Sequence, residues 1–204
     1  MGKAVYYGGV MIKNSRWYNY FIKLSEDQQD ILIHSVDKLY EDNQEYCDVG
    51  NYDHLCNLFT SLALYKLLMD QGKKSRDAYK IVAQEGWKAV EKTAKTYQRL
   101  IRIPGMFKIF SKFLPRMFEK GSGYGWDHQW NEMNDHRMDF QCNKCIYATI
   151  LEKYGIREFG NMFCHADIIN YGHLPGVTFK REHTLCSDGK PCDFLFINDK
   201  KAAK

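Results

Sequence analysis

The chain has 204 residues, of which 45% are hydrophobic and 26% charged, and its formal net charge is +4. A chain of this length and composition can bury a sizeable core, which excludes a disordered protein. The charge is modest and lies largely in the basic C-terminus (Lys200, Lys201 and Lys204), with no Lys/Arg stripe expected along a long helix. We therefore expect no nucleic-acid partner.

Cysteine usage and hydropathy predict a cytoplasmic protein. The seven cysteines are odd in number, and no secretory signal precedes them, so reduced thiols are expected rather than a disulfide framework. The longest apolar stretch, Leu62 to Met69, is interrupted by Lys66 and is far too short to span a bilayer. We expect no membrane partner.

The first 120 residues are expected to be helical. Ser25 and Ser75 are candidate N-caps, each followed by apolar residues at helical spacing. The expected helices run from Ser25 to Tyr40, His54 to Met69, Arg76 to Thr96, and Pro104 to either Pro115 or Phe118.

After Gly123 the pattern changes to alternation, which is typical of strands. The expected strands are 125–133, 138–142, 177–185 and 192–197, with helices at 143–154 and 160–171 between the two pairs. The first pair turns near Asn134-Asp135. The fold class is therefore α+β, with a helical N-terminal half packed on a roughly four-stranded antiparallel sheet (β-β-α-α-β-β). We expect a single domain over residues 1–204, helical over about 1–120 and sheet-containing over about 121–198.

Strand periodicity predicts a pocket lined by polar and aromatic side chains. In the strand 177–185, Val177 and Phe179 mark the core-facing side, so Arg181 and His183 are expected to point inward as well. A buried Arg needs a partner, either a core carboxylate or a bound anion. Four further residues are expected on the same aromatic wall: Trp126, His128, Trp130 and Cys192.

The cysteines of the C-terminal part allow three interpretations. Cys142-x2-Cys145 has metal-ligand spacing, and a zinc site needs Cys164, His165 or Cys192 to complete it. A thiolate nucleophile assisted by His183 or His128 is the second interpretation. Inert buried thiols are the third, to which Cys47, Cys56 and Cys186 are assigned. Asp167 shares a helix face with Cys164 and would raise the pKa of that thiol unless a cation intervenes.

Several short motifs occur in an order that resembles a known family. They are Gly125-Trp126, Cys145, F-C-x-x-D at 163–167, R-x-x-T-L at 181–185 and G-x-x-C-D-F at 189–194. Together they resemble the L-2-amino-thiazoline-4-carboxylic acid hydrolase family over roughly residues 120–197. The resemblance implies a hydrolase that opens a small cyclic, sulfur-containing amino acid to an N-carbamoyl thiol. The family-pattern positions are Cys145, Cys164, Asp167, Thr184, Gly189, Cys192, Asp193 and Phe194.

The preferred hypothesis is a hydrolase that opens a C–N or C–S bond in a small heterocyclic acid. Its candidate catalytic residues are Cys192, Cys164, His183, Asp167 and Cys145, and its candidate substrate-binding residues are Arg181, His128, Trp126 and Trp130. The alternatives are a non-catalytic small-molecule sensor with an aromatic pocket, and an adaptor that binds a partner through its helical face. A small-molecule substrate is the expected partner, and assembly into a homo-oligomer is left open.

Overall fold

The computed structural model describes residues 7–202. The chain divides into two compact units, residues 1–89 and 90–204, and the helix α5 (Ser75–Leu100) contains the boundary between them. The union of the two units in a single domain stays a prediction. No helix within residues 7–202 is long and apolar enough to cross a membrane.

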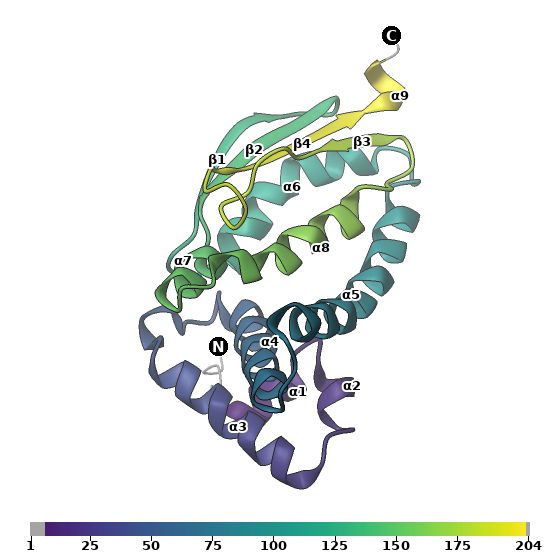
Figure 1. Ribbon diagram of the computed structural model, residues 1–204. Coiled ribbons are helices and arrows are strands. Elements are labelled where there is room, and N and C mark those ends of the chain that lie inside the picture. The colour runs from purple at the N-terminus through teal and green to yellow at the C-terminus, as the bar shows by residue number, and fades with distance from the viewer. Residues whose placement is uncertain (1–6, 203–204) are drawn as a thin grey trace. The chain divides into compact units, whose positions relative to one another are not determined.

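The first unit is helical, as expected (Figure 1). It contains α1 (Gly8–Lys13), α2 (Tyr18–Phe21), α3 (Glu26–Glu41), the 3-10 turn η1 (Gln44–Tyr46), α4 (Tyr52–Asp70) and the first part of α5. The predicted cap of α3 is confirmed as a capping box. The Ser25 hydroxyl accepts from the Gln28 backbone N–H at 3.4 Å, and the Gln28 side chain accepts from the Ser25 N–H at 3.0 Å. α5 begins at Ser75 itself, one residue earlier than expected.

A close approach between Trp17 and α5 holds part of this unit together. Trp17 is 2% exposed, and its indole N–H donates to the Val82 carbonyl at 2.8 Å. The ring lies over Gly86, where a Cβ would come within 2.5 Å of Trp17 Cζ2. Only a residue without a Cβ leaves room for the ring at this position.

Gly86→Ala is therefore expected to lower the free energy of unfolding by about 1–3 kcal/mol, because the indole or the helix must shift. Urea denaturation measures the change. Gly121→Ala is the matched control, since nothing lies within 4 Å of a Cβ built there. An equal effect of both substitutions would contradict the role of the Trp17 contact, because replacing Gly by Ala within a helix is otherwise slightly stabilising.

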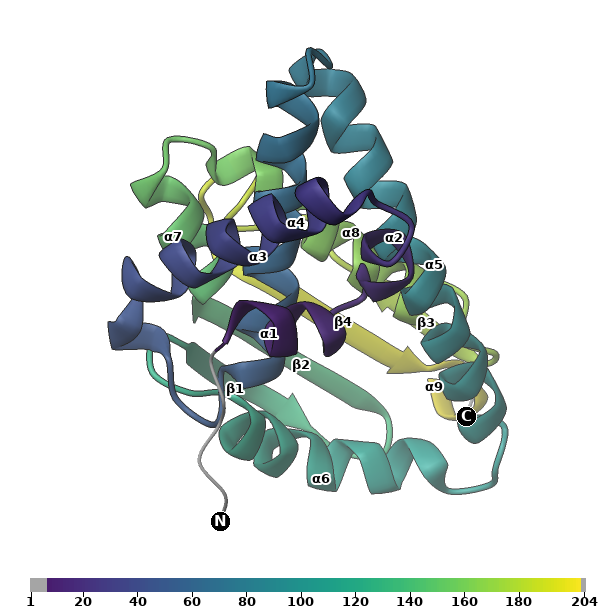
Figure 2. The same ribbon diagram turned by 90° about the horizontal axis from the view of Figure 1, so that it is seen from below.

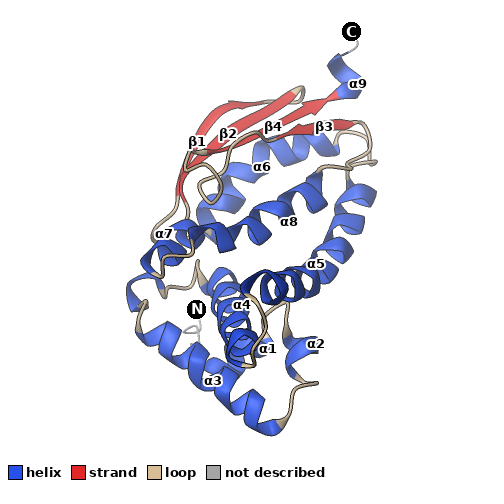
Figure 3. Ribbon diagram, viewed as in Figure 1, coloured by secondary structure: helices blue, strands red, loops and turns tan. Residues whose placement is uncertain are grey.

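The second unit confirms the α+β fold class, with a four-stranded antiparallel sheet in the order β1-β2-β4-β3 (Figures 2 and 3). Its strands are β1 (Asp127–Met133), β2 (Arg137–Lys144), β3 (Val177–Lys180) and β4 (Cys192–Asn198). Its helices are the end of α5, α6 (Met106–Gly121), α7 (Ile146–Lys153), the 3-10 turn η2 (Arg157–Gly160), α8 (Asn161–Tyr171) and α9 (Asp199–Ala202).

One face of the sheet is apolar and is covered by α6 and α8 (Figure 1). Phe140 of β2 pairs in register with Phe194 of β4, and their rings stack at 4.6 Å between centroids. From α6, Phe118 contacts Phe140 at 5.6 Å, and from α8, Tyr171 contacts Phe196 at 5.3 Å. The alternation predicted for β2 and β4 is confirmed, because Met138, Phe140, Cys142, Cys192, Phe194 and Phe196 are all buried.

The predicted continuation of β3 to Leu185 is wrong, because the strand ends at Lys180. The Asp193 carboxylate accepts hydrogen bonds from the backbone N–H groups of Glu182 (3.0 Å) and His183 (2.6 Å). These two donors therefore do not form hydrogen bonds with a neighbouring strand. Residues 181–191 form a loop instead, which we call the 181–191 loop. The period-two argument that sent His183 inward therefore does not apply to it.

Of the two ends expected for α6, the continuation past Pro115 is confirmed, and the helix ends at Gly121, three residues beyond Phe118. Phe118 packs against the sheet, and this contact outweighs the backbone hydrogen bond lost at Pro115. One expectation for α6 needs correction. The statement that no Lys/Arg stripe follows a helix is wrong for α6. Basic residues recur at every fourth position of this helix: Lys108, Lys112, Arg116 and Lys120.

Candidate functional site

Five cysteines of the second unit gather around the start of β4, and we call them the thiol cluster: Cys142, Cys145, Cys164, Cys186 and Cys192. They come from β2, the N-cap of α7, α8, the 181–191 loop and the start of β4. All are free thiols. The expected approach of Cys145, Cys164 and Cys192 agrees with this arrangement, since their charges act on one another.

Arg181 is the cation of the cluster. Its side chain is 4% exposed, its NH1 group forms an ion pair with the Asp167 carboxylate, and NH1 also donates to the Cys164 carbonyl at 3.3 Å. The guanidinium lies 4.4 Å from the centre of the Phe194 ring. Burial lowers the pKa of Arg181, but the negative charge of Asp167 raises it overall, so the group stays charged. Its Nε is buried and makes no hydrogen bond.

Of the two partners expected for Arg181, the core carboxylate is therefore present in the form of Asp167. The binding of a substrate carboxylate by Arg181 stays a prediction. Arg181 also supplies a cation that acts against the effect of Asp167 on Cys164, since its charge lowers the pKa of that thiol.

Cys164 is the thiol whose acidity this environment increases. The pKa of Cys164 is lowered to about 7, and the largest cause is a hydrogen bond from Cys186. Burial raises the pKa, but the positive charge of Arg181 and the Thr184 hydroxyl lower it further. The Asp167 charge acts in the opposite direction. The residue as a whole is half-buried, unlike the other four cysteines of the cluster, which are buried.

The other candidate thiols are held protonated. Burial raises the pKa of Cys145 to about 12, although the N–H groups at the start of α7 act against it. Burial also raises the pKa of Cys192, whose sulfur accepts the Leu185 backbone N–H at 3.3 Å. The hydrogen bond to Cys164 raises the pKa of Cys186, as does its burial. Among the three predicted cysteines, Cys164 fits a nucleophile best.

We expect iodoacetamide to label Cys164 first, with a rate that rises through pH 7 and levels off above it. Only the thiolate reacts, so the rate falls as the proton binds below its pKa of about 7. Mass spectrometry of digests taken at pH 6, 7 and 8 measures the labelling of each thiol. Cys47, whose pKa burial raises to about 12, is the internal control and should react slowly throughout. Uniform labelling of all seven thiols would contradict the assignment.

His183 lies on the 181–191 loop. Its side chain is 37% exposed, and Nδ1 lies 2.6 Å from Oδ2 of Asp188. The carboxylate therefore orients the imidazole, with the other ring nitrogen left available. His183 is adjacent to Thr184, whose hydroxyl bonds to Cys164, so the loop carries both groups.

The predicted aromatic row of β1 is present on the covered face of the sheet. His128 stacks between Trp126 and Trp130, with ring centroids 5.8 Å away on either side, and Phe118 meets it edge-on at 5.1 Å. Burial lowers the pKa of His128, against the effect of Asp127, so the ring is neutral at pH 7. No hydrogen bond joins His128 to the thiol cluster among the described residues. Its role and those of the two Trp residues in substrate binding stay predictions.

Sequence reasoning assigned Cys186 to the inert thiols and gave Thr184 no chemical role, yet both bond to Cys164. Both residues lie in the R-x-x-T-L-C string that begins at Arg181, and this proximity in sequence was the signal that could have placed them at the site. Gly160 makes room for this arrangement, because a Cβ there would collide with the Cys186 sulfur.

The zinc interpretation finds no support in the donor geometry. Within the part of the chain that the structure describes, no group of three His, Cys, Asp or Glu residues is arranged to hold a metal ion. Cys142 and Cys145, the basis of that interpretation, are buried thiols, and the Cys142 sulfur donates to the Lys144 carbonyl at 3.0 Å.

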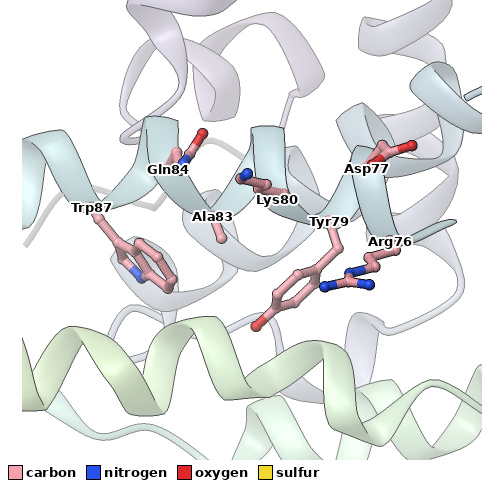
Figure 4. Close-up of a pocket in the computed structure, with 7 residues that line it drawn as sticks. All are labelled: Arg76, Asp77, Tyr79, Lys80, Ala83, Gln84 and Trp87. Atoms are coloured by element: carbon pink, nitrogen blue, oxygen red, sulfur yellow. The ribbon is translucent and has the colours of Figure 1, made fainter. Parts of the chain in front are cut away.

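A pocket of about 500 Å³ lies in the first unit and is lined by α5 alone (Figure 4). Its lining residues are Arg76, Asp77, Tyr79, Lys80, Ala83, Gln84 and Trp87. It contains none of the residues predicted for the site, and its lining offers no thiol and no histidine.

The fold and the thiol cluster together define an α+β protein with a half-buried cysteine of lowered pKa beside a buried arginine side chain. The family model of L-2-amino-thiazoline-4-carboxylic acid hydrolase matches residues 54–196, more than two thirds of the chain. The chain belongs to this family. The match begins within α4, so it extends to helices that lie outside the C-terminal motifs on which the resemblance was based. Searches of curated proteins and of solved structures found no match.

Proposed function

We propose that the protein is a hydrolase that opens the ring of a small thiazoline amino acid, with Cys164 as its nucleophile. The observation that carries this proposal is the half-buried Cys164 thiol, held between hydrogen-bond donors and Arg181 in a chain of this family. A thiol ionised near neutral pH is a competent nucleophile, whereas a buried, protonated thiol is not.

The first step is attack of the Cys164 thiolate on the ring carbon between sulfur and nitrogen, the carbon that bears the amino group. A new S–C bond forms, and the C–S bond of the ring breaks. The ring sulfur leaves as a thiolate that takes up a proton from water. The product of this step is an isothiourea that links Cys164 to the opened substrate.

In the second step, water adds to the isothiourea carbon and the Cys164 thiolate leaves. This yields an N-carbamoyl thiol product and restores the enzyme, so one water is consumed per ring opened. His183 is the proposed base for this water, since Asp188 orients its imidazole and His183 follows on the same loop as Arg181. The Cys186 thiol, which already bonds to Cys164, stabilises the departing thiolate.

Arg181 is the proposed partner of the substrate carboxylate. Asp167 occupies NH1, while the buried Nε has no partner, so the guanidinium retains a donor for a second anion. A planar fork can serve two carboxylates at once, which a lysine cannot. Trp126, His128 and Trp130, which stack on one another in a row, are proposed to contact the remainder of the substrate.

The test is an assay of thiol release from L-2-amino-thiazoline-4-carboxylate by the full chain. We expect free thiol to appear in proportion to enzyme, together with an N-carbamoyl product in mass spectrometry. The same protein is titrated with the substrate by calorimetry. Binding without thiol release would indicate the alternative, a non-catalytic sensor, and the absence of both would reject this substrate class.

A further inference from the structure

We propose that α6 is a docking surface for an anionic lipid membrane. This surface, the α6 ridge, is defined by three exposed apolar residues, Ile109, Phe113 and Met117, and by the four basic residues Lys108, Lys112, Arg116 and Lys120. It lies outside the thiol cluster and does not depend on the function proposed above. It departs from the expectation of no membrane partner, which rested only on the lack of an apolar stretch long enough to span a bilayer.

The apolar part of the ridge is not used by the core. Phe107 is buried, and Phe110, Leu114 and Phe118 pack against the sheet, which accounts for one side of the helix. Ile109, Phe113 and Met117 are 47%, 50% and 59% exposed. They are four residues apart and thus form one continuous stripe beside the buried side.

The basic residues form a parallel row. Lys108, Lys112, Arg116 and Lys120 are also four residues apart, so the row extends about 18 Å at 1.5 Å per residue. All four are exposed, and none of their side chains makes an ion pair or hydrogen bond within residues 7–202. Glu119 is the one acidic residue of the helix. The row is therefore uncompensated positive charge.

The basic row and the apolar stripe together indicate which kind of partner binds the α6 ridge. A nucleic-acid backbone would use the basic row but offers nothing to a stripe of Phe, Ile and Met. A membrane with anionic headgroups uses both, because the apolar side chains enter the boundary between headgroups and acyl chains while Lys and Arg remain at the phosphates. Charge complementarity and the exposed apolar stripe therefore favour an anionic lipid surface.

Co-sedimentation of the full chain with lipid vesicles tests this directly. We expect binding to vesicles of phosphatidylcholine with 30% phosphatidylserine, and binding weaker by at least tenfold to phosphatidylcholine alone, since each basic residue near an anionic surface contributes roughly fivefold. The double variants Phe113→Ser/Met117→Ser and Lys112→Glu/Arg116→Glu should each lose at least tenfold in affinity for the anionic vesicles.

Matched controls carry the same chemical changes at exposed sites of the first unit. They are Ile22→Ser/Val49→Ser for the apolar pair and Lys73→Glu/Lys74→Glu for the charge reversal, and both should bind like the unaltered protein. Absence of vesicle binding, or an equal loss in controls and ridge variants, would overturn the proposal. The proposal would also be overturned if the protein bound duplex DNA or an acidic protein, and if this binding required the basic row but not Phe113 and Met117.

Discussion

Replacing Cys164 with serine is expected to reduce kcat for thiol release by about a thousandfold or more. The serine hydroxyl is not ionised near neutral pH, so the hydrogen bond from Cys186 and the charge of Arg181 no longer yield a nucleophile. Substrate affinity should change little, because the substituted atom is not the proposed carboxylate partner. Steady-state assays and calorimetry on one preparation separate the two effects.

Two further variants make this result specific. Cys47→Ser, in the first unit, removes a thiol of raised pKa and should leave turnover unchanged. Cys186→Ala removes the hydrogen bond that contributes most to the lowered pKa of Cys164, so the rise of kcat with pH should move to higher pH while activity survives. Full activity of Cys164→Ser would exclude Cys164 as nucleophile, and the same loss from Cys47→Ser would point to a stability effect.

The sequence predicted the elements of this fold because each depends on nearby residues. The α3 cap requires only Ser25 and Gln28, and the alternation of Phe140 with Cys142 marks one face of β2 whatever packs on it. The end of β3 was not predictable in this way. It depends on Asp193, which accepts two backbone donors eleven and ten residues away in sequence.

The sequence predicted which residues belong to the site better than it predicted which of them contact one another. The C-terminal motifs pointed to Cys164, Asp167 and Arg181, and the structure joins Arg181 to Asp167. Which cysteine becomes acidic depends on loop atoms that no periodicity describes. Cys186 had been assigned to the inert thiols, but the 181–191 loop brings it against Cys164. The α6 ridge required exposure values, because spacing alone does not tell an exposed stripe from a buried one.

Removing the charge of Arg181 is expected to have the largest effect on stability. Arg181→Ala leaves the Asp167 carboxylate without its cation and exposes a gap over Phe194, so the free energy of unfolding should fall by about 3–5 kcal/mol. The same change should raise the pKa of Cys164, because the Arg181 charge helps to lower it. Urea denaturation measures the first effect, and pH-dependent alkylation of the protein that remains folded measures the second.

Arg181→Lys separates the structural role of Arg181 from a role in substrate binding. Lysine keeps the charge beside Asp167 but loses the planar fork, so the protein should fold with reduced stability. If Arg181 also holds the substrate carboxylate, loss of one bidentate contact should raise the substrate Kd by about tenfold to a hundredfold. Affinity is best compared between Cys164→Ser and Cys164→Ser/Arg181→Lys, where no turnover consumes the ligand. A lower melting temperature with an unaltered Kd would mean that Arg181 only supports the fold and the Cys164 thiolate, and that the substrate carboxylate is bound elsewhere.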